Sequence, residues 1–125
     1  MLKFSIITVV KNDKNHILKT INSVKKQSFK NFEHIIVDGK SNDGTSEIIK
    51  KNLKKNKKNK HIIKNDKNLY QALNYGINIS KGKYIAILHS GDLFINKNTL
   101  KTISADIKDN DAVSSNILFK KENKI

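Results

Sequence analysis

With 125 residues, the chain can bury one hydrophobic core, so we expect a single domain or part of one. The absence of Cys excludes disulfide bonds and thiolate metal sites. No apolar run approaches the ~20 residues of a membrane span, and the first residues lack the layout of a signal peptide. These features predict a cytoplasmic protein, either fully soluble or associated with the inner face of a membrane.

The formal net charge of +14 would suit a partner rich in phosphate groups. However, all 25 basic residues are Lys, whereas Arg is the usual residue for bidentate contacts with phosphate and guanine. Lys, Asn and Ile are over-used together, as in a coding sequence biased towards A and T. We therefore interpret the charge as a matter of composition, ahead of specific nucleic-acid binding. Attraction of a Lys-rich surface to anionic lipid headgroups stays open as an alternative.

The predicted elements alternate between strands and helices along the whole chain. Apolar, β-branched runs predict five strands, at 4–10, 32–37, 61–64, 84–88 and 112–119. Apolar residues at helical spacing predict four helices between them, at about 15–27, 45–53, 69–79 and 98–107, with Gly82 as the C-cap of the third. Such alternation is typical of a mostly parallel sheet with helices on both faces. We therefore expect a three-layer α/β/α domain.

Three polar loops follow predicted strands, at 11–13, 38–45 and 90–92. Because the carboxyl ends of parallel strands meet at one edge of a sheet, we expect these loops to form one site. Asp38 could accept hydrogen bonds from a base or a ribose, and Asp92 could bind a divalent metal together with phosphate oxygens. The alternative for Asp92 is a Ser-Gly-Asp turn whose carboxylate caps the next helix.

Other polar and aromatic residues give weaker signals. His16, His34 and His61 have no partner at metal-ligand spacing, so we expect them at the surface or at strand edges. Tyr70 and Tyr75 are interpreted as helix packing, with sugar stacking as the alternative. Neither common Gly-rich phosphate loop occurs, which argues against a dinucleotide dehydrogenase and a nucleotide triphosphatase.

Four motifs occur in order along nearly the whole chain. They are FSIITVVKN, then SVKKQSFKNFEHIIVDGKSNDGT from Ser23 to Thr45, then NDKNLYQALNYGINISKGKYIAIL, then HSGD. Together they resemble the N-terminal half of a family 2 glycosyltransferase with the GT-A fold, in the branch near colanic-acid and capsular-polysaccharide enzymes. The second motif is the most specific, and HSGD falls where this family has its D-x-D-type metal motif.

The resemblance implies an enzyme that transfers a sugar, with inversion, from a nucleotide-diphospho-sugar to a glycan or lipid-linked acceptor in cell-surface polysaccharide synthesis. It implies Mg²⁺ or Mn²⁺ as the cofactor, acting as a Lewis acid on the nucleoside-diphosphate leaving group. The implied site residues are Thr8, Val10, Asp38, Asp66, Ser90 and Gly91 for the donor and Asp92 for the metal. Lys64 stands where related sequences often have Glu, and it could meet a phosphate or remain solvated.

In this family the general base that deprotonates the acceptor lies downstream of the metal motif, so we expect the base beyond residue 125. Residues 1–125 are then one GT-A-type nucleotide-sugar-binding domain, its N-terminal portion, incomplete at the C-terminus. Two alternatives stay open. One is a nucleotide-sugar-binding or interaction module that transfers nothing, and the other is a Lys-driven protein of nucleic-acid or membrane surfaces.

Overall fold

The computed structural model describes residues 1–53, 58–65, 68–107 and 118–120. These residues form a five-stranded sheet with the order β3-β2-β1-β4-β5. The strands are β1 (Phe4–Val10), β2 (Phe32–Asp38), β3 (Lys60–Ile63), β4 (Tyr84–Ile87) and β5 (Leu118–Lys120). All neighbouring strands are parallel except β4 and β5, which are antiparallel. The prediction of a mostly parallel sheet is therefore confirmed.

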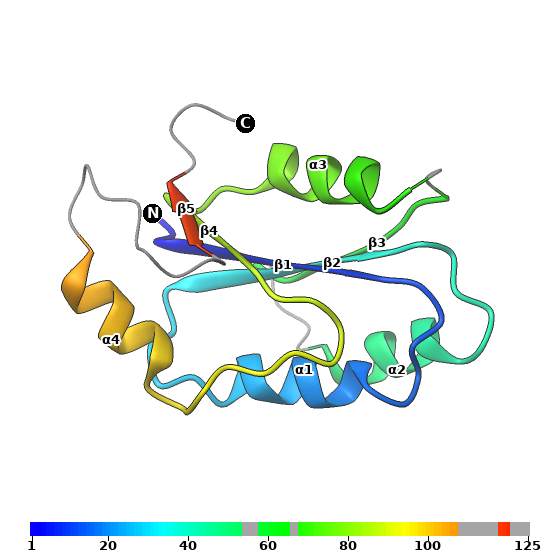
Figure 1. Ribbon diagram of the computed structural model, residues 1–125, viewed down its shortest axis with the longest axis horizontal. Coiled ribbons are helices and arrows are strands. Elements are labelled where there is room, and N and C mark those ends of the chain that lie inside the picture. The colour runs from blue at the N-terminus through cyan, green and yellow to red at the C-terminus, as the bar shows by residue number, and fades with distance from the viewer. Residues whose placement is uncertain (54–57, 66–67, 108–117, 121–125) are drawn as a thin grey trace.

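Helices cover both faces of this sheet, which confirms the predicted three layers (Figure 1). The helices are α1 (Ile17–Lys25), α2 (Thr45–Asn52), α3 (Leu69–Ile79) and α4 (Thr99–Asp106). α3 lies on one face, and α1 and α2 lie side by side on the other. In the described part of the chain, no helix has the length and apolar character needed to cross a bilayer.

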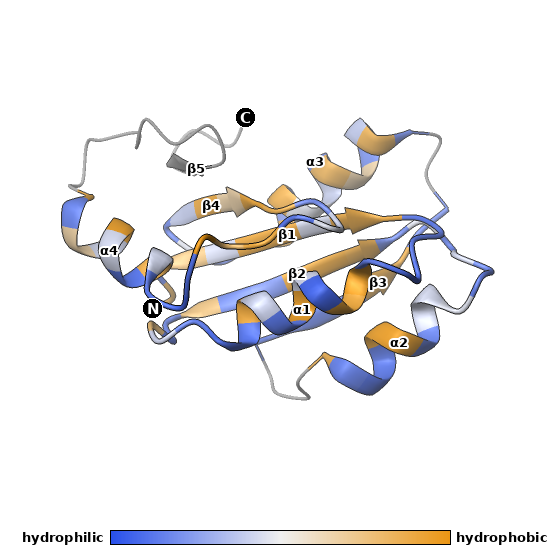
Figure 2. Cartoon of the chain, turned by 60° about the horizontal axis from the view of Figure 1, so that its bottom comes forward, coloured by the Kyte–Doolittle hydropathy of each residue, from blue (hydrophilic) through white to orange (hydrophobic). Residues whose placement is uncertain are grey.

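The core follows from the alternation of side chains along the central strands. In β1, Phe4 and Ile6 pack with residues of α1 and α4, whereas Ile7 packs with residues of α3. Because helices cover both faces, the strands are largely apolar, as Figure 2 shows, and even the polar residues of β2 are buried. Glu33 in β2 accepts hydrogen bonds from the Ser5 hydroxyl (2.6 Å) and from Lys60 Nζ (2.9 Å).

The register determines where the loops leave the sheet. Val10 pairs with Asp38 and Asp38 pairs with Ile63, so β1, β2 and β3 end at one level. The last residue of β4, Ile87, pairs with Ile7, which lies earlier in β1. The chain therefore leaves β4 before the edge of the sheet and crosses towards α1 (Figure 1).

Some predicted details of these elements are wrong. The C-cap of α3 is Ser80, and Gly82 instead lies against β1, where its N–H donates to the Ser5 hydroxyl (2.7 Å). A Cβ at Gly82 would lie 2.5 Å from the backbone of Phe4 and Ser5, so the close approach of two backbones requires glycine here. The predicted strand at 112–119 lies mainly outside the described residues, which include only Leu118–Lys120 as β5.

Candidate functional site

The loops after β1 and β2 are joined by hydrogen bonds. The Asn12 N–H donates to the Ser41 hydroxyl (2.8 Å), and the Asn42 N–H donates to Asn12 Oδ1 (2.8 Å). The Asp13 N–H donates to the Thr45 hydroxyl (2.9 Å) at the start of α2. The two loops thus form one continuous surface at the carboxyl edge of the sheet, as expected for parallel strands.

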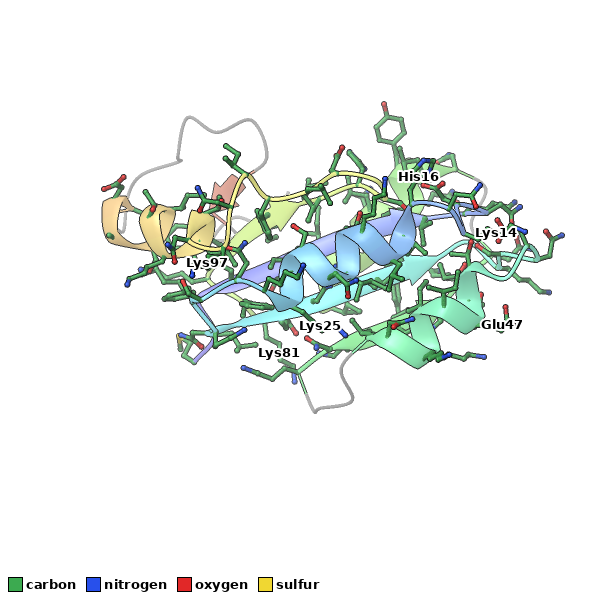
Figure 3. The ribbon with its side chains drawn as sticks, turned by 90° about the horizontal axis from the view of Figure 1, so that it is seen from below. Lys14, His16, Lys25, Glu47, Lys81 and Lys97 are labelled. Atoms are coloured by element: carbon green, nitrogen blue, oxygen red, sulfur yellow. The ribbon has the colours of Figure 1, made fainter. Side chains whose placement is uncertain are left out.

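The loop after β4 reaches the same surface along α1. The Gly91 N–H donates to the Thr20 hydroxyl (2.8 Å), and this hydroxyl donates to the Asp92 carbonyl oxygen (2.9 Å). Gly91 has a left-handed φ of 94°, and a Cβ there would lie 3.6 Å from the Cβ of His16. Figure 3 shows His16 at the N-terminal end of α1. The third predicted loop is therefore also part of this surface.

The carboxylate of Asp38, at the end of β2, is fully buried. One oxygen accepts hydrogen bonds from the N–H (3.0 Å) and hydroxyl (2.7 Å) of Ser41. The other oxygen accepts from the Ser46 hydroxyl and is 3.2 Å from His61 Nε2. Burial alone would raise the pKa of Asp38, but the hydrogen bonds from Ser46, Ser41 and His61 outweigh it and lower the pKa. Asp38 is therefore an ionised acceptor that organises the loop around it.

A second acidic group, Asp13, links the first loop to the third. His16 Nδ1 is 2.7 Å from its carboxylate, and the hydrogen bond from His16, followed by the influence of the Ser90 hydroxyl, lowers the pKa of Asp13. Ser90 Oγ is buried and has no hydrogen-bond partner of ordinary geometry within the described residues. The Ser90 hydroxyl therefore lies near the Asp13 carboxylate, which brings the first and third loops together.

A cavity of about 190 Å³ opens at the carboxyl edge of the sheet. Its walls come from the ends of β1 and β2, from the segment after β3 and from the first turn of α3: Val9, Val10, Lys11, Gly39, Lys64, Asn68, Leu69 and Ala72. Lys64 Nζ lies 5.0 Å from the centre of the Tyr75 ring, and Lys11 lies against Gly39. Two larger hollows, of about 420 and 380 Å³, lie beside α1, so size alone does not identify the site.

The structure brings some of the predicted site residues together and separates others. Val10 lines the cavity, and Ser90, Gly91 and Asp92 lie in the loop after β4. Thr8 is fully buried, and its hydroxyl is 2.9 Å from His34 Nε2. The predicted contact between Thr8 and a nucleobase stays a prediction, and the burial of Thr8 does not support it. The predicted role of Asp66 falls outside the described residues.

The prediction that His34 lies at the surface or at a strand edge is wrong. His34 is in the second strand from one side of the sheet, with only 1% of its surface exposed, because α1 and α2 cover that face. Burial lowers the pKa of His34 to about 3, so the ring is neutral at physiological pH. Of the two tyrosines interpreted as packing, Tyr75 packs beside the core, whereas Tyr70 is 74% exposed.

Asp92 is an exposed carboxylate on a loop whose backbone is hydrogen-bonded on both sides. Within the described ranges, no three His, Asp or Glu side chains are grouped as a metal site. Hard divalent cations accept one protein carboxylate together with phosphate oxygens and water. The donor set therefore fits a metal shared with a diphosphate, and does not fit a metal bound by the protein alone.

One residue of this surface, Thr20, was not found from the sequence. It lies in the buried stripe of α1 with Ile17, Ile21 and Val24, where the pattern suggested only packing. The sequence feature that could have indicated this role is a hydroxyl in an otherwise apolar stripe, because a buried hydroxyl needs a hydrogen-bond partner.

Comparison with known proteins identifies a family for this chain. A family model described as Glycosyl transferase family 2 matches residues 5–124. The chain is 40% identical over 95 residues to the Escherichia coli UDP-Glc:alpha-D-GlcNAc-diphosphoundecaprenol beta-1,3-glucosyltransferase WfaP, and the match covers 73% of this chain and 36% of that protein. The chain spans between 13% and 43% of the length of curated relatives that it matches.

Solved structures show the same fold. Staphylococcus aureus TarS in complex with UDP-GlcNAc has a TM-score of 0.76 and 31% identity, over 83% of this chain and 30% of that chain. The mannosyltransferase PcManGT from Pyrobaculum calidifontis, in complex with GDP-Man and Mn²⁺, has a TM-score of 0.70 over 78% of this chain and 30% of that chain. At 19% identity, this second likeness is one of fold alone. With a family match over nearly its whole length and a shared fold, the chain belongs to glycosyl transferase family 2.

Proposed function

We propose that this chain is the donor-binding part of an inverting glycosyltransferase. The enzyme transfers a sugar from a nucleotide-diphospho-sugar to a glycan or lipid-linked acceptor in cell-surface polysaccharide synthesis. The observation that carries the proposal is the meeting of three loops at the carboxyl edge of the sheet, beside a cavity and an exposed carboxylate. The family match and the TarS complex with UDP-GlcNAc support the same donor class.

The cavity between β1, β2 and α3 is assigned to the nucleoside of the donor. Val10 and Gly39 offer apolar and backbone surface there, while Lys11 and Lys64 supply positive charge for a phosphate. We assign to Asp38 the role of holding this wall in place through its hydrogen bonds. Direct contact of Asp38 with a base or a ribose stays a prediction. Asp66 keeps its predicted place near the nucleotide-sugar.

The diphosphate is assigned to the loop after β4. Ser90 and Gly91 would contact the phosphates, and Asp92 would bind Mg²⁺ or Mn²⁺. When bound, this ion supplies Lewis-acid stabilisation of the nucleoside-diphosphate leaving group. The chain's own contribution is to fix the loop through Thr20 and to exclude Asp38 from the metal by burying it.

Calorimetric titration with UDP and with GDP, in Mn²⁺ or in EDTA, tests this proposal. We expect Mn²⁺-dependent binding that Asp92→Ala abolishes. Asp106→Ala is a matched control, because it removes the same charge from the exposed end of α4, away from the three loops. A folded chain that binds neither nucleotide, or that binds equally with Asp92→Ala, would contradict the proposal.

We also propose that the chain works at the cytoplasmic face of a membrane. Leu93 and Ile95 are 54% and 91% exposed, and Lys19, Lys26 and Lys97 line the hollow beside them. Apolar side chains surrounded by Lys suit the surface of an anionic bilayer. Flotation with vesicles of anionic and of neutral lipid is the test, and equal recovery from both would contradict it.

The alternative is a nucleotide-sugar-binding module without transferase activity. It predicts donor binding with no turnover and no hydrolysis of the nucleotide-sugar. Binding that collapses with added salt and ignores Asp92 would instead favour a Lys-driven polyanion binder.

A further inference from the structure

A stripe of polar side chains on α1 contacts the segment that follows β4. Thr20 and Ser23 in α1, and Gln27 just beyond its end, are spaced so that they lie on one side of the helix. Figure 3 shows the segment running alongside α1, from the level of His16 towards Lys97. The stripe therefore lies where it can bond the backbone of this segment.

Each member of the stripe contacts a different part of the segment. The Phe94 N–H donates to the Ser23 hydroxyl (2.8 Å), and Gln27 Nε2 donates to the Asn96 carbonyl oxygen (2.7 Å). Thr20 is the member of the stripe that contacts the backbone of Gly91 and Asp92. Ser23 and Gln27 thus fix the chain after the carboxylate, and Thr20 fixes the carboxylate's own backbone.

Thr20 is fully buried, and its hydroxyl both accepts from and donates to the backbone of Gly91 and Asp92. It accepts from the Gly91 N–H at 2.8 Å and donates to the Asp92 carbonyl at 2.9 Å, while the His89 carbonyl is more distant, at 3.5 Å. Gly91 has a left-handed φ, which glycine adopts without strain, so the bonds around the turn determine its position. Removing the hydroxyl leaves the Gly91 N–H and the Asp92 carbonyl oxygen without this partner, and the turn can relax.

We propose that Thr20 is a positioning residue for the metal site: its hydroxyl fixes the Gly91 N–H and the Asp92 carbonyl, and so directs the Asp92 carboxylate towards a diphosphate-bound divalent cation. The inference rests on the proposed function. Thr20 does not line the cavity between β1, β2 and α3. Its removal should therefore weaken the metal-dependent part of donor binding and leave the metal-independent part unchanged.

The test uses the full chain with Mn²⁺ and UDP as probes. Free Mn²⁺ is measured from its electron paramagnetic resonance signal at saturating UDP, and UDP binding is measured separately in EDTA. Thr20→Val keeps the shape of the side chain and removes the hydroxyl, and we expect it to weaken Mn²⁺ affinity by about 10-fold to 100-fold. Thr20→Ser restores the hydroxyl and should recover affinity to within about threefold of the wild type.

Ser23→Ala is the matched control, because it removes a hydroxyl of the same stripe whose partner is Phe94 rather than Gly91. Its Mn²⁺ affinity should stay within about twofold of the wild type. Equal losses in Thr20→Val and Ser23→Ala, or wild-type affinity in Thr20→Val, would overturn the inference. If Thr20→Val does not fold, Gly91→Ala strains the same turn, and unchanged Mn²⁺ affinity in that variant overturns the inference as well. A wild-type chain without Mn²⁺-dependent UDP binding overturns the proposed function itself.

Discussion

Two carboxylates, Asp38 at the end of β2 and Asp92 in the loop after β4, have opposite environments. Asp38 is fully buried and accepts hydrogen bonds from two serines, with His61 beside it. Asp92 is exposed, and the bonds that fix it are made by its backbone. Two residues with the same side chain, one ending a strand and the other on a loop, are therefore suited to different tasks.

The contrast shows how the protein separates scaffold from ligand contact. A buried carboxylate with several donors contributes to stability but has little capacity left for a ligand. An exposed carboxylate on a fixed backbone contributes little to stability and keeps its oxygens available. We expect substitutions on the β2 side to change mainly the free energy of unfolding, and substitutions on the β4 side to change mainly metal affinity.

Asp38→Ala should have the largest effect on stability. It leaves the Ser41, Ser46 and His61 donors without their acceptor in a buried loop, and we expect a loss of about 3 kcal/mol in the free energy of unfolding. Urea denaturation measures this loss. A loss below about 0.5 kcal/mol, together with lost UDP affinity, would reverse the comparison and make Asp38 a ligand contact.

Acidification should destabilise the β2 side through His34. The pKa of His34 is about 3 in the folded chain, whereas its ordinary value of 6.5 applies to the unfolded chain. Unfolding below pH 6.5 therefore takes up a proton. The stabilisation that comes from the neutral His34 ring is fully present above that pH and is lost progressively towards pH 3. The free energy of unfolding should fall by about 2 kcal/mol between pH 7.5 and 5. Carboxylates whose pKa is lowered, such as Glu33, stay ionised in the folded chain between pH 7.5 and 5. His34→Gln should therefore flatten the pH dependence of urea denaturation between pH 7.5 and 5.

Ser41→Ala should have a smaller effect, of about 1 kcal/mol. The Ser41 hydroxyl donates to Asp38 and accepts from the Asn12 N–H, so its loss affects two loops at once. Asn42→Ala is the control, because Asn42 bonds Asn12 through its backbone N–H, which the substitution keeps. Thermal denaturation of both variants checks this prediction, and equal shifts in melting temperature would count against it.

Asp92→Asn should have the smallest effect on stability, within about 0.5 kcal/mol, because the carboxylate is exposed. The same variant should lose Mn²⁺-dependent UDP binding, since an amide is a poorer ligand than a carboxylate for a hard cation. Urea denaturation and calorimetry on one preparation give both values. Marked destabilisation by Asp92→Asn would remove the contrast with Asp38.

The fold could be predicted well because the central strands carry their signal locally. FSIITVV and FEHIIV are continuous apolar, β-branched runs, and the structure assigns strands to both. His34 was misjudged because one polar residue in such a run does not reveal whether its face is covered. Its partner Thr8 and the covering helices come from other parts of the chain.

The site was predicted in outline and missed in detail for the same reason. That the three polar loops converge follows from parallel topology. Hydrogen bonds join the loops after β1 and β2 directly, and the loop after β4 is bonded to Thr20 of α1. The difference between Asp38 and Asp92 depends on Ser46, His61 and Thr20, which lie 8, 23 and more than 70 positions from their partners. Sequence spacing cannot reveal contacts between elements at such separations.

The contact between Thr20 and Gly91 joins residues 71 positions apart, and this separation has a consequence for the order of folding. During synthesis, a ribosome must release β4 and the residues after it before this contact can form. Long loop closures slow folding, whereas the contacts of Asp38 join residues much closer in the chain. A nascent chain can therefore complete its β2 scaffold while its cation site is still absent. Capture of Mn²⁺ by nascent chains of increasing length would then report the end of folding rather than its beginning.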